Sequence, residues 1–467
     1  MLRGKQQEIL NLPYIGHGVV CGVAGSGKSF CAIKRAEFIQ EVTEKRVLIL
    51  SYNNSLINYM QDISGIQTSN IDFKTYHKFA TKCMRNLGKL SNNDILQHNY
   101  EKEKMINTAI DNVIQRDGKV STLERRSFII DEINWMESFG SLSREIYNEI
   151  ERSGRGGANL RKADRKYVFN VYEEYINIRN SEGYRYDWDD LAYHLNAYLE
   201  IEDIEPEYGC IIIDEGQDFS PMMIKSLVNY IKDSGSILYL GDRGQQIYGK
   251  GNMSWKNLGL KIRKVYTLDE NHRNSKQIEK LANSIRENLN LDIEDGLVSV
   301  NSQREGSKPK VISFIDEYEE KKYIVNLAKE YTGKGSTCIV LRSNSDVNEF
   351  TKLLNLNSIY PTKIDRYTTE FNTDNGIFVG NYHSVKGLEF DNVIIAKCSN
   401  SMLENIEGIE DVSEEDINSY VKEYEISLAK LIYVAVSRAK NNLIITHTGE
   451  VLEIIPNEKE ICEFYKE

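Results

Sequence analysis

Short runs of valine, isoleucine and leucine recur along the chain, and each stands beside a loop that carries glycine, aspartate or serine. The first set occupies residues 18–22, 46–51, 209–214 and 236–241, and the second set occupies residues 336–341, 376–380, 392–397 and 441–446. Runs that are apolar throughout are typical of parallel strands covered on both faces. Because helix-like stretches separate them, the pattern predicts an α/β fold with two parallel sheets in tandem.

The first set of strands is interrupted by a long stretch of a different character. Between about residues 88 and 185 the sequence is charged and helix-forming and holds no strand-like run. This change predicts a helical insertion within the first α/β unit. We therefore expect the first unit to comprise residues 1–87 and 186–262, the insertion residues 88–185, and the second unit residues 263–467.

The composition is that of an ordinary globular protein with more than one domain. A chain of 467 residues is too long for one hydrophobic core, and 40% apolar residues are enough to fill several. No apolar run is long enough to span a membrane, and polar residues 5–8 interrupt the start, where a secretory signal would be apolar. The seven cysteines form no CxxC pair, which excludes a zinc ribbon and predicts buried, reduced thiols. We expect a cytoplasmic protein without a membrane partner.

The charge limits how the chain could bind nucleic acid. A formal net charge of -12 argues against a protein that coats nucleic acid through a basic surface. It leaves room for a narrow channel, because base stacking and a few backbone donors tolerate an acidic exterior. Residues 402–425 hold nine acidic side chains and one lysine, which predicts a solvated acidic helix or loop, with a partner-docking segment as the alternative.

The strand at 18–22 leads into a phosphate-binding loop. Residues 22–29 read Gly-Val-Ala-Gly-Ser-Gly-Lys-Ser, which is the full G-x4-GK[ST] pattern, and a helical stretch follows. Backbone N–H groups of such a loop curl around the phosphates, the lysine faces the β and γ oxygens, and the last hydroxyl reaches Mg²⁺. The residues expected to bind ATP here are Gly22, Gly25, Ser26, Gly27, Lys28 and Ser29.

The strand at 209–214 ends in acidic residues. Asp214, at the end of the strand, can hold the Mg²⁺ ion, and Glu215 can polarise the attacking water. A lone acidic pair would be ordinary solvated surface. Placed after a buried strand and downstream of the phosphate-binding loop, this pair predicts the second half of an ATPase site.

These and further motifs, in order along nearly the whole chain, resemble those of the UvrD/Rep/PcrA family of superfamily 1 helicases. The further motifs are residues 2–6, 241–248, 271–273, 383–390 and 433–439. The resemblance implies two tandem RecA-like domains that use ATP and Mg²⁺ and bind single-stranded DNA or a tailed duplex. It also implies that Gln6 contacts adenine, Glu389 meets the ribose and Gln245 senses the γ-phosphate. His272 occupies the position beside adenine where the family normally has tyrosine.

Two arginines of the second unit are the candidates for completing the catalytic site. Charge builds on the γ-phosphate oxygens during transfer, so cations supplied from a second domain accelerate the step. Arg273 and Arg438 lie in the motifs that the resemblance assigns to this role. Hydrolysis would then require the two units to close over ATP, and closure would move the chain along its track.

Several aromatic and polar residues are expected to hold the DNA strand. Tyr52 and Tyr76 could stack on bases, with ordinary core packing as the alternative for both. After Tyr248 this chain lacks the tryptophan that family members usually have, and Trp255 is the candidate substitute. The full set of residues expected to contact DNA is Tyr52, Asn54, Thr75, Tyr76, His77, Tyr248, Trp255, Arg342, Asn344 and His383.

One stretch of the chain is much shorter than the corresponding stretch in the family, and this bears on the expected function. Only about thirty residues lie between Asn344 and Gly376, where family members insert a large regulatory subdomain called 2B. The sequence therefore favours an ATP-driven single-stranded DNA translocase or helicase. Its second and third motifs resemble those of the family's UvrD branch, and this resemblance implies 3′→5′ polarity. The alternative is an ATPase switch or accessory subunit of a nuclease-containing DNA repair or phage-defence complex, with little unwinding of its own.

Overall fold

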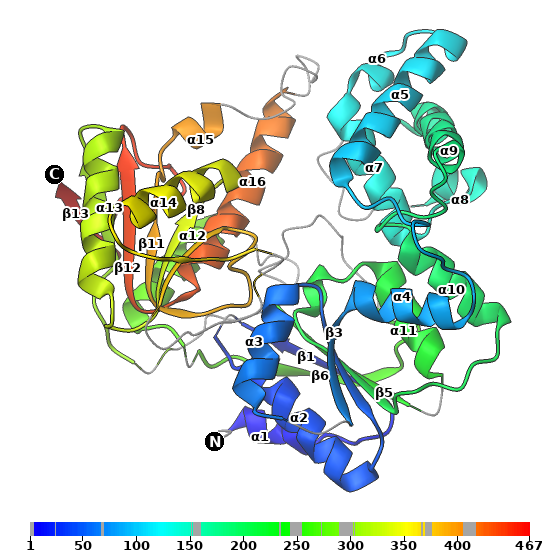
Figure 1. Ribbon diagram of the computed structural model, residues 1–467, viewed down its shortest axis with the longest axis horizontal. Coiled ribbons are helices and arrows are strands. Elements are labelled where there is room, and N and C mark those ends of the chain that lie inside the picture. Colours follow the sequence, from blue (N-terminus) through cyan, green and yellow to red (C-terminus); the bar gives the residue numbers. More distant parts are fainter. Residues whose placement is uncertain are drawn as a thin grey trace.

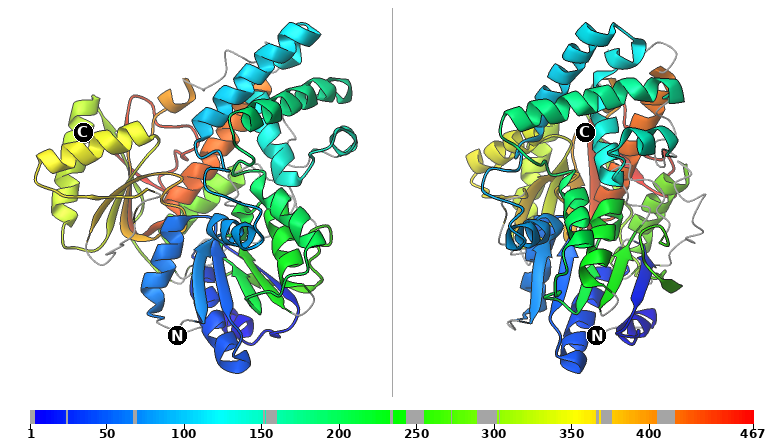
Figure 2. Two further views of the ribbon diagram at one scale, coloured as in Figure 1. Left: turned by 45° about the vertical axis from the view of Figure 1, so that its right-hand side comes forward. Right: turned by 90° about the vertical axis from the view of Figure 1, so that its right-hand side faces the viewer.

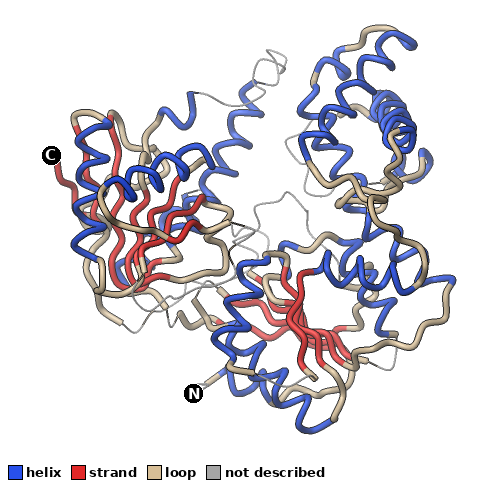
Figure 3. Tube along the Cα trace, in the orientation of Figure 1, coloured by secondary structure: helices blue, strands red, loops and turns tan. Residues whose placement is uncertain are grey.

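The computed structural model shows two lobes, each built on a parallel sheet, and a helical segment that stands on the first lobe (Figures 1 and 2). It describes residues 4–23, 25–66, 70–150, 152, 160–232, 235–242, 255–271, 273–288, 302, 304–365, 368, 376–404 and 417–467. Figure 3 separates the two sheets from the all-helical segment by colour. The predicted α/β class with two tandem sheets is confirmed.

The first sheet has the strand order β3-β2-β4-β5-β1-β6, and every pairing in it is parallel. Its strands are β1 (His17–Gly22), β2 (Val47–Ser51), β3 (Ile71–Thr75), β4 (Cys210–Ile213), β5 (Ser236–Gly241) and β6 (Ile262–Leu268). Along β2, Val47 and Ile49 face one core while Leu48 and Leu50 face the other. The central strands are apolar throughout because helices cover both of their faces.

Two layers of helices cover this sheet. On one face lie α1 (Lys5–Leu10), α2 (Lys28–Thr43) and α3 (Asn54–Ser64). On the other lie α4 (Tyr76–Asn86), α10 (Leu191–Ile201) and α11 (Pro221–Ile231). Parallel strands place their carboxyl ends at one edge, so the segments that follow β1 and β4 meet there.

The sequence pattern missed both edge strands of this sheet. In β3 the side chains between Ile71 and Thr75 are half-buried, and β6 exposes most of its residues. Edge strands need no continuous apolar run because one side and part of a face meet solvent. The domain boundary expected between residues 262 and 263 was also misplaced, since β6 begins there and pairs with β1.

The second sheet has the order β13-β7-β12-β11-β8-β10-β9 and is likewise parallel. Its strands are β7 (Lys310–Phe314), β8 (Thr337–Leu341), β9 (Thr362–Lys363), β10 (Ile377–Asn381), β11 (Phe390–Ile395), β12 (Ala439–Thr448) and β13 (Glu463–Lys466). Helices α12 (Lys276–Asn288) and α16 (Ile417–Val436) cover one face, and α13 (Glu317–Tyr331) and α14 (Asn344–Leu356) cover the other. The short helix α15 (Ser401–Glu404) follows β11. Only β7, β9 and β13, toward the edges, were not predicted.

The segment between β3 and β4 carries the helices that stand on the first lobe. They are α5 (Asn99–Asp117), α6 (Ser121–Glu124), α7 (Arg126–Phe139), α8 (Arg144–Glu149) and α9 (Arg165–Ser181). They enclose a hydrophobic core of their own, which includes Ile106, Ile133 and Tyr175. The chain leaves and returns through one parallel bridge between Ile95 and Tyr186, so a narrow neck joins this segment to the lobe.

Two further expectations concern side chains and membranes. All seven cysteines are free, and six of them are buried, with Cys83 half-buried, which agrees with the predicted structural thiols. Within the described ranges, no helix has both the length and the apolar character that crossing a bilayer requires.

Candidate functional site

A cavity of about 450 Å³ lies between the two lobes. Its lining from the first lobe consists of Gln6, Gly25, Gly27, Lys28, Ser29, Phe30, Tyr59, Ile63 and Glu215. Its lining from the second lobe consists of Arg273, Arg304, Gly387, Glu389, Arg438 and Lys440. The fold therefore brings together nine residues that were assigned to the nucleotide site from six separate motifs.

The phosphate-binding loop joins β1 to α2 and depends on its glycines. Gly25 and Gly27 adopt φ angles of 76° and 80°, which side chains other than glycine rarely tolerate. A Cβ atom on Gly25 would also collide with the side chain of Asn271, and one on Gly27 would collide with Gln6. The Lys28 ammonium donates to the carbonyls of Gly22 and Val23 at 2.9 and 3.0 Å. The loop thus holds its own cation beside the backbone that is expected to receive phosphate.

Gln6 lies on α1, across the loop from the second lobe. Its Nε2 donates to the carbonyl of Ser26 at 2.9 Å, which ties α1 to the phosphate-binding loop. The hydroxyl of Ser26 is buried and has no hydrogen-bond partner in the structure. A buried hydroxyl without a partner is costly, and a phosphate oxygen would satisfy it.

Ser29 and Asp214 form the candidate metal position. The Ser29 hydroxyl donates to Asp214 Oδ2 at 2.6 Å, while Asp214 Oδ1 is buried without a hydrogen-bond partner. Burial and the neighbouring Glu215 raise the pKa of Asp214 to about 7. A hydroxyl and a carboxylate with an unsatisfied oxygen are ligands that Mg²⁺ prefers, so these residues fit the ion.

Glu215 stands directly after β4 in a strained conformation. Its φ of 50° is unusual for a residue with a side chain, and such strain often occurs at functional sites. Burial opposes its ionisation, but Lys28, Lys386 and Arg438 together lower its pKa below the ordinary value. Gln217 donates to the Glu215 carboxylate and accepts a hydrogen bond from the backbone of Asp242 at 2.8 Å. Gln217 was not singled out from the sequence, because its role depends on this contact.

Arg438 reaches the cavity from the end of α16. It is almost fully buried, and its guanidinium donates to the carbonyls of Val434 and Leu388 at 2.9 and 3.3 Å. Burial and the nearby Arg273 lower its pKa to about 10, which still leaves the group protonated near neutral pH. A guanidinium held rigidly by backbone carbonyls is positioned in advance for an anion.

Arg273 lies opposite the phosphate-binding loop and is paired with Glu389. Its Nε donates to Glu389 Oε2 at 2.7 Å, and Lys440 lies 2.9 Å from Glu389 Oε1. Burial opposes ionisation of Glu389, but these two cations lower its pKa to about 2. In the structure Glu389 therefore pairs with two positive side chains. The role expected from the sequence was contact with the ribose, and it did not include these ion pairs.

The lobes are also joined by a buried ion pair next to this cavity. Lys386, in the turn after β10, contacts Asp218, which ends the short 3₁₀ helix η2 (Gly216–Asp218) after Glu215. Both side chains are at most 5% exposed. His383 lies on the surface of the same turn, and the carbonyl of His383 accepts the N–H of Lys386 at 3.3 Å. One turn thus connects the nucleotide site to a residue expected to contact DNA.

Three aromatic side chains gather beside this region on the first lobe. The ring of His77 lies 5.6 Å from that of Tyr52 and 5.2 Å from that of Trp188, edge to face in both cases. All three are half-buried. Trp188 was missed from the sequence, where it is one aromatic residue in an acidic run between two helices. The fold alone places it with the residues expected to stack on bases.

Other expected DNA contacts are engaged within the protein. Tyr76 is fully buried, and its hydroxyl lies 2.7 Å from Ser226 Oγ, so the core-packing alternative holds and Tyr76 cannot stack on a base. The Arg342 guanidinium contacts the carbonyl of Met402 and the hydroxyl of Tyr424, between α15 and α16. The ring of Trp255 packs against that of Tyr239, with the ring centroids 4.8 Å apart. These contacts do not favour roles on a DNA strand for these residues.

The remaining expected contacts lie at helix starts. Thr75 caps α4 by accepting the backbone N–H of Lys78. Asn54 and Asn344 begin α3 and α14, and their side-chain oxygens accept from Lys78 and Asn381 at 2.7 and 2.8 Å. Gln245, Tyr248 and His272 lie outside the described residues.

Comparison with known proteins assigns this arrangement to a family. The profile of the UvrD/REP helicase N-terminal domain matches residues 2–257, and that of the UvrD-like helicase C-terminal domain matches residues 266–371 and 366–450. The chain belongs to the UvrD/REP helicase family. Together these matches cover both lobes and the helical segment, which agrees with the resemblance seen in the motifs.

Two relatives show how far the likeness extends. The ATP-dependent DNA helicase UvrD2 of Mycobacterium tuberculosis is 26% identical over 200 residues, which cover 40% of this chain and 28% of the relative. The ATP-dependent DNA helicase PcrA of Staphylococcus aureus is 22% identical over 347 residues, which cover 69% of this chain and 45% of the relative. The chain thus spans less than half the length of these family members.

Proposed function

We propose that this chain is a cytoplasmic ATPase that couples hydrolysis in the cavity between its lobes to movement along single-stranded DNA. The observation that carries the proposal is the composition of that cavity. Lys28 and Glu215 come from the first lobe, whereas Arg273 and Arg438 come from the second, and all four line one space. Because the catalytic residues are divided between the lobes, hydrolysis depends on the relative position of the lobes and is linked to their movement.

Each side chain has a chemical task in this proposal. Lys28 and the loop backbone bind the β and γ phosphates, and Glu215, ionised and held by Gln217, takes the proton of the attacking water. Arg273 and Arg438 stabilise the charge that grows on the γ-phosphate oxygens. Ser29 and Asp214 would hold Mg²⁺, which neutralises phosphate charge when bound. Gln6 would contact the adenine base.

The proposed track runs along the aromatic side chains of the first lobe. Tyr52, His77 and Trp188 present π faces or edges that bases of any sequence can use. His383 and Asn344 supply polar contacts from the second lobe. Contacts on both lobes allow one to hold the strand while the other releases it, and the family motifs favour 3′→5′ movement.

One structural feature favours a second role, that of an ATPase switch for a nuclease or another protein in DNA repair or phage defence. Just 20 residues separate α14 (Asn344–Leu356) from β10 (Ile377–Asn381), and in the described part of this stretch the two-residue strand β9 is the one regular element. Without a subdomain between them, autonomous separation of a duplex has less support than translocation. Such a switch would bind the same ATP and need a partner for full turnover.

Hydrolysis by the purified chain, with and without single-stranded DNA, separates these roles. For a motor, we expect DNA to stimulate hydrolysis strongly and the chain to displace a bound protein from one end of a long single strand. A tailed duplex tests unwinding, with tails of either polarity giving the direction. Hydrolysis that ignores DNA and rises only with another protein would favour the switch instead.

A further inference from the structure

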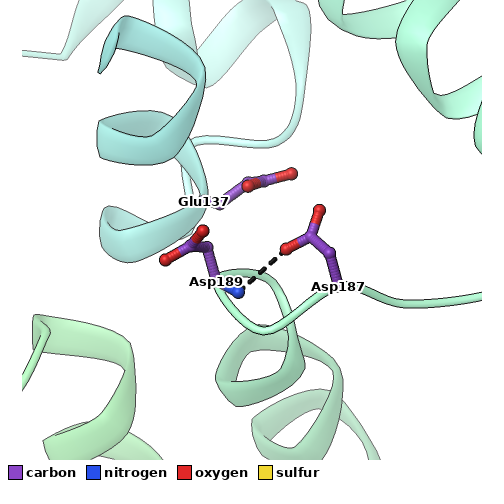
Figure 4. Close-up of side chains that lie close together, drawn as sticks. All are labelled: Glu137, Asp187 and Asp189. Carbon is purple, nitrogen blue, oxygen red and sulfur yellow. Dashed lines mark hydrogen bonds between the residues drawn. The ribbon is translucent and has the colours of Figure 1, made fainter. Parts of the chain in front are cut away.

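A buried cluster of charged side chains joins the helical segment to the loop that carries Trp188. Its centre is the ammonium of Lys102, on α5, which lies 2.6 Å from Glu137 on α7. The same nitrogen lies 3.3 Å from Asp187 and 2.8 Å from Asp189, on either side of Trp188. Figure 4 shows the three carboxylates converging from the helix and from the loop. One lysine thus connects the helical segment to both neighbours of this tryptophan.

The loop that carries Trp188 is further locked by its own contacts. Asp187 Oδ1 accepts the backbone N–H groups of Asp189 and Asp190, and Asp190 Oδ1 accepts that of Asp187 at 2.9 Å. The Arg179 guanidinium binds Asp187 at 3.0 Å and Asp190 at 2.6 Å. The backbone bonds shape the turn within itself, and Arg179 ties the turn to α9. The Tyr175 hydroxyl, also on α9, donates to Asp187 Oδ2 at 2.6 Å, so α9 holds the turn as well. Among the contacts of the described residues, Lys102 ties the turn to Glu137 on α7 and to its own helix α5, so it sets where the turn lies relative to these two helices.

The charges of the cluster explain why it does not need a metal ion. Glu137, Asp187 and Asp189 offer oxygens within 4.8 Å of one another, a spacing at which a cation could bind. Lys102 already supplies the positive charge at that point. Burial, and next the negative charge of Asp187, raise the pKa of Glu137 well above its ordinary value.

We infer that Lys102 is a positioning residue for the DNA track. It holds the 187–190 turn so that the half-buried ring of Trp188 stays against His77, 5.2 Å away, on the side where the strand would pass. The inference rests on the proposed function, because it gives Trp188 a base to stack on. It adds that the helical segment influences the affinity for single-stranded DNA through a buried cluster that does not itself contact the DNA.

A second ion pair on the same helix provides a matched control. Glu132 lies on α7 five positions before Glu137, is equally inaccessible, and pairs with Arg152 at 2.5 Å. The Arg152 guanidinium also lies over the ring of Phe128, 5.7 Å from its centroid, so these contacts of Arg152 lie within the helical segment. Losing either cation should lower the stability of the helical segment. Only loss of Lys102 should alter the turn that carries Trp188.

The experiment compares Lys102→Met, Arg152→Met, Asp189→Asn and Trp188→Ala in the full chain, with a fluorescein-labelled oligo-dT strand as the probe. Trp188→Ala should raise the Kd by about 5- to 100-fold, the effect of losing one stacked base. Lys102→Met and Asp189→Asn should each raise the Kd by at least about threefold, and by no more than Trp188→Ala does. Arg152→Met should bind like the native chain. Adding Lys102→Met to Trp188→Ala should weaken binding no further, and Lys102→Arg should restore most of the affinity.

A spectroscopic signal reports the position of the ring directly. With Trp135→Phe and Trp255→Phe, Trp188 is the last of the three tryptophans, and oligo-dT should quench its emission. Asp189→Asn should reduce that quenching, and because the Asp189 side chain is 40% exposed this variant should fold even if Lys102→Met does not. If Trp188→Ala binds normally, the proposed track is wrong. If Trp188→Ala binds weakly while Lys102→Met and Asp189→Asn match Arg152→Met, the positioning role alone is overturned.

Discussion

At the scale of single residues, the candidate ATP site combines groups whose protonation the protein controls closely. Lys28, Lys386 and Arg438 keep Glu215 ionised despite its burial, which a general base requires. Arg438 remains a cation although burial lowers its pKa. Glu389 stays ionised because Arg273 and Lys440 flank it. Each group therefore has the charge that its proposed task needs near neutral pH.

Replacement of Lys28 by alanine, or of Glu215 by glutamine, should abolish hydrolysis while the fold is retained. Loss of a general base typically lowers turnover by about 10²- to 10⁴-fold. Phosphate release from ATP measures the effect, and circular dichroism during heating checks the fold. Ser64→Ala is a suitable control, because its half-buried hydroxyl bonds to Gln61 and Ile66 at the end of α3. Normal turnover in either site variant would remove that residue from the site.

The pH dependence of stability should reveal the ion pairs of Glu389. Its pKa is about 2 in the folded protein against an ordinary 4.5, so these pairs stabilise the fold above pH 4.5. That contribution, about 3 kcal/mol by linkage, should be lost as the pH falls from 4.5 toward 2. Urea unfolding of the native chain and of Glu389→Gln should differ at pH 7 and converge in acid. An equal difference at pH 7 and pH 3 would contradict the assignment.

At the scale of elements, the same aromatic residue type serves two purposes on neighbouring segments. Tyr52 follows β2 and stays half-buried beside His77, whereas Tyr76 begins α4 and points into the core. The strand end presents its side chain at the edge of the sheet. The first turn of the helix packs against α11 through Ser226. Position within the element, not residue type, decides which tyrosine can meet DNA.

Substitutions at these two tyrosines should have opposite effects. Tyr76→Phe should lower the free energy of unfolding by about 1 kcal/mol, the net worth of one buried hydrogen bond, and leave the DNA affinity unchanged. Tyr52→Ala should raise the Kd for oligo-dT by at least about fivefold, as expected for a lost stacking surface. Urea unfolding and fluorescence anisotropy measure the two quantities. Weaker DNA binding by Tyr76→Phe would mean that the ring is not confined to the core.

At the scale of the whole molecule, contacts between the lobes connect the ATP site to the track. Lys386 and Asp218 form a buried pair, and α3 reaches the second lobe where Asn58 donates to the carbonyl of Thr368 at 3.0 Å. The first contact adjoins both Glu215 and the His383 turn, whereas Asn58 reaches Thr368, in the segment that precedes β10. The buried pair is therefore the contact through which DNA binding would influence hydrolysis.

Lys386→Met should reduce the stimulation of hydrolysis by single-stranded DNA more than it reduces hydrolysis without DNA. Its removal leaves Asp218 buried without its cation, a change that costs about 3 to 5 kcal/mol when such a pair is broken. Asp218→Asn combined with Lys386→Met should lose less stimulation than the two single effects added together, because the residues act as one unit. Asn58→Ala, which removes one contact between the lobes and leaves this pair in place, should keep the stimulation. Strictly additive effects in the double variant would contradict the pairing.

Sequence alone determined the chemistry that local pattern encodes. The glycines, Lys28 and Ser29 follow one another in a single loop, and the apolar central strands differ plainly from helices. It could not determine the edge strands β3 and β6, which mix polar with apolar residues because one side meets solvent. Nor could it separate Tyr52 from Tyr76, or find Trp188 and its link to Lys102, 86 positions earlier in the chain. Burial and contact between distant residues depend on how elements pack, and only the tertiary structure decided them.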